Sequence, residues 1–119
     1  MSHDFTAQKA ETFATFADLS KANDLPDVAD IDLFFVPARD DADWRALADA
    51  LSREGYVCEW VDPREEEDET GAVSDEDPYL MATLLDQPVS ASSIWTGEEH
   101  ATRIALAQGF APDGWGFEG

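Results

Sequence analysis

The sequence predicts an α+β fold: a ferredoxin-like βαββαβ sandwich, with a four-stranded antiparallel sheet and two helices on one face, preceded by an N-terminal helix. The main observation is the order of the periodic segments, which runs helix, then strand, helix, strand, strand, helix, strand. The second is size, because 119 residues with 44% hydrophobic side chains suffice for one core. We therefore expect an N-terminal helix and linker over residues 1–29 and one α/β domain over residues 30–119.

The N-terminal helix is expected from Thr6 to about Ala22, before the break at Pro26. Its apolar stripe follows the i, i+3, i+4, i+7 pattern and should dock on the rest of the domain. The stripe comprises Phe13, Phe16, Ala17 and Ser20.

The first two strands are expected at residues 31–36 and 56–61. Alternation in the first places Ile31, Leu33 and Phe35 on one face. The connections to the intervening helix are short, which predicts a right-handed crossover between two parallel strands that need not be adjacent.

That intervening helix is expected to begin at an N-cap, Asp40 or Asp41, and to run to about Glu54. Gly55 would end it, because glycine accepts the left-handed conformation common after helices. The inward stripe is predicted to be Trp44, Leu47, Ala48 and Leu51.

The second half of the domain should open with a strand at residues 79–85, although its continuous apolarity would also suit a helical turn. A loop is expected at residues 88–93. The segment from Thr96 to Glu99 has the form of a capping box and predicts a helix from there to Gln108, closed by Gly109. Its inward residues would be Ala101, Ile104 and Ala105.

The last strand is expected at residues 114–118 and should pair with the first half of the motif. Trp115 and Phe117 point to one face of such a strand, and we expect them to pack under the helices. The opposite face would carry Gly114, Gly116 and Glu118, with Gly116 leaving room for close approach by a backbone or a ligand.

The charge balance restricts the class of partner. Acidic residues number 27 and basic residues 7, a formal net charge of −20. This field repels phosphates, so it disfavours direct nucleic-acid binding, including an RNA-recognition platform built from Phe34 and Trp115. A basic protein surface is the more natural partner; the alternative is that the acidity serves only solubility.

The acids are densest between residues 62 and 77, where a solvated loop is the simple interpretation. The functional interpretation is an acidic surface that attracts an arginine-rich segment of a partner. A calcium loop is not expected, since the EF-hand spacing is missing. The candidate partner-binding residues here are Glu65, Glu66, Glu67, Asp68, Glu69, Asp75, Glu76 and Asp77.

The residue patterns do not indicate an enzyme, and no cofactor or metal is expected. No nucleophile–base pair, glycine-rich phosphate loop or metal-ligand cluster is recognisable, and Glu59 should point to solvent from a strand. Cys58 is expected to act as a small buried hydrophobic residue. The sequence has no apolar run long enough for a bilayer and no recognisable secretory signal, which favours the cytoplasm.

Three stretches resemble the regulator of ribonuclease activity B (RraB) family. They are residues 34–37 before 43–48, residues 51–57, and Asp113-Gly114-Trp115-Gly116, the most specific of the three. The resemblance covers about residues 30–118, with Pro112 where the family often has tyrosine. It implies a very acidic ferredoxin-like protein without enzymatic activity that binds ribonuclease E and inhibits RNA turnover. On that basis Asp113, Gly114, Trp115 and Gly116 join the candidate partner-binding residues.

The leading hypothesis is thus a non-enzymatic acidic regulator that binds a basic protein partner, by resemblance a ribonuclease E-type enzyme, without direct contact to nucleic acid or membrane. One alternative is a structural domain that associates with itself through the sheet face and has no ribonuclease role. Another is a domain that binds a ligand or catalyses a reaction. That alternative requires a concave pocket holding a desolvated carboxylate.

Overall fold

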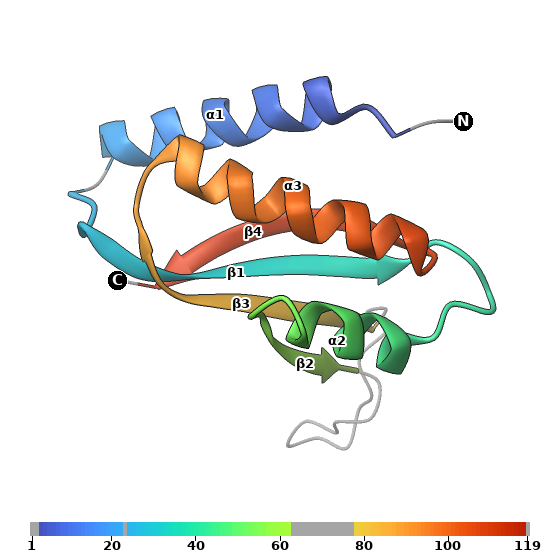
Figure 1. Cartoon of the computed structure of the whole chain (residues 1–119). Helices are drawn as coiled ribbons and strands as arrows, with labels where there is room; N and C mark the ends of the chain where they lie inside the picture. The colour runs from blue at the N-terminus through green and yellow to red at the C-terminus, as the bar shows by residue number, and fades with distance from the viewer. Residues whose placement is uncertain (1–2, 23, 63–77, 119) are drawn as a thin grey trace, which may run out of the picture.

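The computed structural model describes residues 3–22, 24–62 and 78–118 (Figure 1). The strands form one sheet of order β2-β3-β1-β4 in which neighbouring strands are antiparallel. This arrangement confirms the predicted ferredoxin-like class, with β1 and β2 parallel and separated by β3. The elements in chain order are α1 (Phe5–Ala22), β1 (Val28–Pro37), α2 (Trp44–Ser52), β2 (Val57–Val61), β3 (Tyr79–Pro88), α3 (Ala91–Ala107) and β4 (Phe110–Glu118).

The core lies between the sheet and the two helices α2 and α3, and α1 lies on α3 (Figure 1). Ile31, Leu33 and Phe35 of β1 are each 1% exposed, and Leu47 and Leu51 of α2 are fully buried. The predicted inward faces of β1 and α2 are therefore confirmed. Among the described residues, no helix is both long and apolar enough to cross a membrane.

Both domain helices begin at other residues than predicted. Asp43 caps α2, accepting a 2.9 Å hydrogen bond from the Arg45 amide, whereas Asp40 and Asp41 precede the helix. Several neighbouring acids could serve as the cap, and only the observed chain path selects among them.

The prediction that a capping box at Thr96 begins the last helix is wrong, because α3 already begins at Ala91. Ser90 is its N-cap and accepts a 3.1 Å hydrogen bond from the Ser93 amide. Of the predicted loop at residues 88–93, positions 91–93 therefore belong to α3 and Pro88 ends β3. The Thr96 hydroxyl donates instead to the Ser92 carbonyl within the helix. The inward positions Ala101 and Ala105 are nonetheless fully buried, and Gly109 ends the helix with a φ of 82°.

The predicted stripe of α1 is also wrong in part. Phe13 is 38% exposed and Ala17 and Ser20 are exposed, while Phe16 does pack against the core. The buried residues of α1 are the polar Gln8 and Thr12. Hydrophobicity alone could not select this face, because α3 presents hydrogen-bonding partners to it.

A β-bulge interrupts the pairing of β4 with β1. Leu33 pairs with Trp115 but Phe35 pairs with Pro112, so β4 contains one extra residue in this interval. Gly114 lies inside it with a φ of 117°, a conformation that L side chains rarely adopt. Residues three apart on a regular strand face opposite sides. The bulge turns both Pro112 and Trp115 to the helix side of the sheet.

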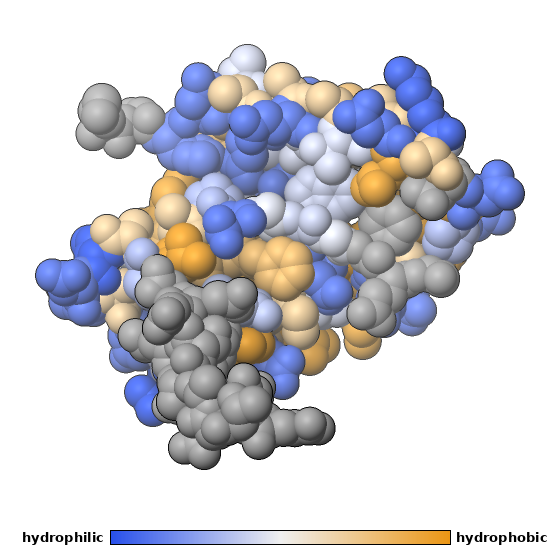
Figure 2. Space-filling view, turned by 180° about the vertical axis from the view of Figure 1, so that it is seen from behind, coloured by the Kyte–Doolittle hydropathy of each residue, from blue (hydrophilic) through white to orange (hydrophobic). Residues whose placement is uncertain are grey.

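The other face of the sheet is not covered by the described helices (Figure 1). Figure 2 views the molecule from this side and shows hydrophobic residues in its middle, bordered by hydrophilic ones. The alternation of β1 and β3 turns half-buried apolar and aromatic side chains to it, with a 5.7 Å edge-to-face contact between Phe34 and Tyr79. The apolar residues of this face include Phe34, Val36, Val57, Val61, Tyr79 and Met81.

Replacement of Gly114 by alanine should destabilise the fold by about 1–3 kcal/mol, because any Cβ is strained at this φ. No described atom lies within 4 Å of a Cβ built at Gly114 or at Gly116, so crowding contributes to neither position. Gly116→Ala is the matched control and should change stability by less than about 1 kcal/mol in either direction. Urea unfolding of the two variants measures the difference. Equal stability of both variants would contradict the conformational role of Gly114.

Candidate functional site: a cavity between α1, α3 and β4

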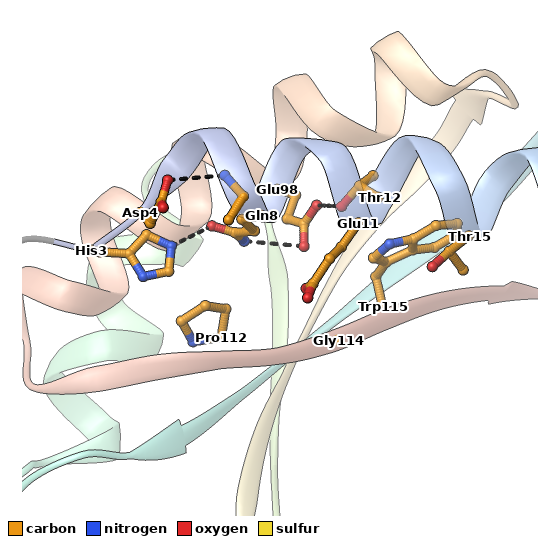
Figure 3. A pocket seen from close by; sticks show the side chains of 11 residues that line it. His3, Asp4, Gln8, Glu11, Thr12, Thr15, Glu98, Pro112, Gly114 and Trp115 are labelled. Atoms are coloured by element: carbon orange, nitrogen blue, oxygen red, sulfur yellow. Dashed lines mark hydrogen bonds between the residues drawn. The ribbon is translucent and has the colours of Figure 1, made fainter.

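The described surface contains a cavity of about 440 Å³ beneath the N-terminal half of α1 (Figure 3). Its walls come from three places that are distant in sequence: α1 with the residues before it, one position of α3, and the bulged part of β4. The lining residues are His3, Asp4, Ala7, Gln8, Glu11, Thr12, Thr15, Glu98, Pro112, Gly114 and Trp115.

Glu98 of α3 is the central polar group of this region and is only 4% exposed. Its Oε1 accepts a 2.5 Å hydrogen bond from the Thr12 hydroxyl, and its Oε2 accepts a 3.1 Å bond from the Gln8 amide nitrogen. Both donors belong to α1, so one carboxylate joins the two helices (Figure 3). Bonds to an ionised acceptor are stronger than neutral ones, which makes this the main polar attachment of α1.

The Gln8 side chain is fixed by three partners. Its amide nitrogen also donates to the hydroxyl of the fully buried Thr102, at 3.0 Å. Because that nitrogen donates twice, the amide oxygen must accept the 2.6 Å contact from His3 Nε2, which assigns the proton to this ring nitrogen. Every described buried side-chain polar atom has a partner, so this network is satisfied.

Burial raises the pKa of the Glu98 carboxyl above its ordinary value of 4.5. The hydrogen bonds from Thr12 and Gln8 lower it, the nearby Glu11 carboxylate raises it, and His3 lowers it, but burial is the largest effect. The site therefore holds a desolvated carboxylate in a concave place. Since both of its oxygens already accept hydrogen bonds, the geometry favours a fixed charge over a mobile proton acceptor.

The cavity lining is acidic and carries one large aromatic ring. It includes Asp4, Glu11 and Glu98 but no lysine or arginine, and the indole of Trp115 forms part of one wall (Figure 3). Among the described residues there is no group of three or more His, Cys, Asp or Glu side chains arranged to hold a metal ion. The arrangement suits a cationic organic group better than an anion.

The predicted site residues divide into three sets. Gly114 and Trp115 line the cavity, whereas Asp113 is exposed on the same strand and Gly116 pairs with Asp32 of β1. The acidic candidates at residues 65–69 and 75–77 lie outside the described residues.

The expectation for Trp115 holds in part. It is half-buried, packs against the core on the helix side of the sheet, and also faces the cavity. The Phe117 side chain lies outside what the structure describes. Gly116 is open on its Cβ side to 4 Å among described atoms, so close approach within the chain does not explain this glycine.

Sequence reasoning missed Gln8, Thr12 and Glu98. The carboxylate that it did discuss, Glu59, is exposed on β2 as expected. A signal was present: Glu98, Ala101, Thr102 and Ala105 share the i, i+3, i+4, i+7 spacing of one buried stripe. Gln8 and Thr12 are likewise four residues apart on α1.

A family model described as "Regulator of ribonuclease activity B" matches residues 9–117. The chain belongs to this family. The match includes α1 from Lys9 onward, so it begins before residue 30, where the resemblance seen in the sequence begins. A search of curated proteins finds no match to the sequence.

The structure assigns a local role to Gly114 and Trp115, two residues of the Asp113–Gly116 stretch that carries the sequence resemblance to this family. Gly114 makes the bulge possible, and the bulge directs Trp115 toward α1 and the cavity. Two residues of this stretch, Gly114 and Trp115, thus form part of one wall of the acidic cavity.

The pH dependence of stability should report on Glu98. Because its folded pKa is raised, its contribution to stability is complete below pH 4.5 and is lost as the pH rises through the folded value. Glu98→Gln stays neutral throughout. Its free energy of unfolding relative to the parent protein should therefore increase as the pH is raised from about 4 to about 8.

Urea unfolding at a series of pH values measures this difference. Glu59→Gln, which neutralises an exposed carboxylate on β2, is the matched control. Its free energy of unfolding relative to the parent protein should change much less with pH. If the free energy of unfolding of Glu98→Gln relative to the parent protein does not change with pH, burial does not penalise the charge of Glu98.

Proposed function

We propose that this protein is a non-enzymatic regulator that binds a ribonuclease E-type enzyme and lowers its RNA cleavage. The observation that carries the proposal is the match of residues 9–117 to the regulator of ribonuclease activity B family. The acidic cavity at the family-specific stretch supports binding over catalysis, because its buried carboxylate is held by protein donors.

Electrostatics support a basic segment of the enzyme as the surface that is bound. A net charge of −20 attracts lysine- and arginine-rich segments from a distance and speeds their association. Such segments commonly bind RNA through phosphate contacts. Occupation of a basic segment by this protein would therefore compete with RNA, which gives inhibition without any chemical step. Within this proposal, Asp113 and the acids at 65–69 and 75–77 contribute to the long-range attraction.

The open sheet face favours a second candidate, self-association. Phe34, Tyr79 and Met81 are half-buried there and Val57 is 55% exposed, an apolar surface that a second copy could cover. Sedimentation at micromolar concentration distinguishes the two candidates, since a monomer removes the second.

Binding should weaken strongly with salt. With a purified ribonuclease E-type enzyme, we expect the Kd to rise at least roughly tenfold between about 50 and 500 mM NaCl, because screening shortens the range of the attraction. RNA cleavage at low salt should fall as the protein is added. Isothermal titration and a fluorescent RNA cleavage assay measure the two effects.

The matched variants change the five acids at positions 65–69 to their amides, or instead neutralise five exposed acids elsewhere: Asp18, Asp24, Asp41, Asp49 and Glu59. Equal loss in both would indicate general charge, and greater loss in the first would assign a specific contact to residues 65–69. Absence of binding at low salt would overturn the proposal.

A further inference from the structure

We propose that the cavity between α1, α3 and β4 receives an arginine side chain of the basic protein partner. This inference rests on the proposed function and adds the contact that would give a long-range attraction its specificity. It depends on the composition of the walls, on the absence of lysine and arginine from that lining, and on the shape left by the bulge.

The first step is the fixed negative charge. Glu98 is 4% exposed and held by Thr12 and Gln8, so its position does not depend on the ligand. Asp4 and Glu11 are exposed at the rim, where they can meet a cation as it enters. The electrostatic attraction between a cation and a carboxylate is stronger when the carboxylate is partly desolvated than when it is fully hydrated.

The second step is that the chain's own nearby cations are engaged elsewhere. Arg103 of α3 pairs with Glu99 at 3.3 Å and lies over the Phe5 ring at 4.3 Å. Lys9 lies over the Phe13 ring at 5.7 Å. Neither basic residue belongs to the cavity lining, which therefore presents its carboxylates without a lysine or arginine among them.

The third step is the aromatic wall. The Trp115 indole and the carboxylates border the same space, and Gly114 adds no side chain to fill it (Figure 3). A guanidinium is planar, stacks on an indole and donates in a fork to carboxylates, whereas an ammonium is a compact and strongly hydrated charge. This combination selects arginine over lysine.

The test uses N-acetyl-arginine amide as probe and N-acetyl-citrulline amide as its neutral isostere, with the full chain labelled for NMR. Arginine should shift the Gly114 amide and the Trp115 indole signals in a saturable way, and citrulline should not. Arginine shifts spread evenly over the acidic surface, or equal shifts from both probes, would overturn the proposal.

Two pairs of variants locate the site. Thr15 lines the cavity, so Thr15→Arg places a guanidinium inside it and should raise the Kd of the probe at least roughly tenfold. Ala14→Arg adds the same charge on α1 outside the lining and should leave this Kd unchanged. Glu11→Gln should raise the Kd of the probe roughly two- to fivefold, and Glu59→Gln on β2 should leave the Kd unchanged. Equal effects within either pair would contradict the assignment.

The same variants separate this inference from the proposed function. If Thr15→Arg binds the ribonuclease as tightly as Ala14→Arg does, the cavity is not the contact although the regulatory function stands. If the probe binds the cavity and the ribonuclease does not bind at all, the arginine site stands and the proposed function fails.

Discussion

The buried carboxylate of Glu98 is the constraint on which the arrangement of α1 depends. A desolvated carboxylate requires donors, and α1 supplies two of them through Gln8 and Thr12. The helix therefore turns a polar face inward and leaves Phe13 partly in solvent. In this position α1 forms one side of the acidic cavity, so the same interaction attaches the helix and shapes the candidate site.

A second constraint comes from the backbone of β4. The bulge at Gly114 brings Pro112 and Trp115 to one side of the sheet, facing the helix that Glu98 holds. The cavity exists because these two features face each other across a short gap. The bulged part of β4 and the helix α1 thus form one structural unit with α3, although they are far apart in the sequence.

Much of the fold was predictable from local pattern. Alternation along β1 predicts its buried face, and helical spacing predicts the buried stripe of α2. Both predictions succeed because the hydrophobic effect favours burial of apolar side chains whichever residues they pack against. The helix starts were less predictable. Asp40, Asp41 and Asp43 can each cap a helix, and Ser90 competes with Thr96, so the choice depends on where the sheet positions the chain.

The sequence by itself determined the fold class, the strong negative charge and the membership suggested by Asp113 to Gly116, since each is a property of composition or of short stretches. The tertiary structure alone decided which polar residues are buried. Gln8 and Glu98 are 90 positions apart, and neither is apolar, so no local pattern pairs them. Their contact arises only when α1 packs on α3, because a buried hydrogen bond needs both partners at once.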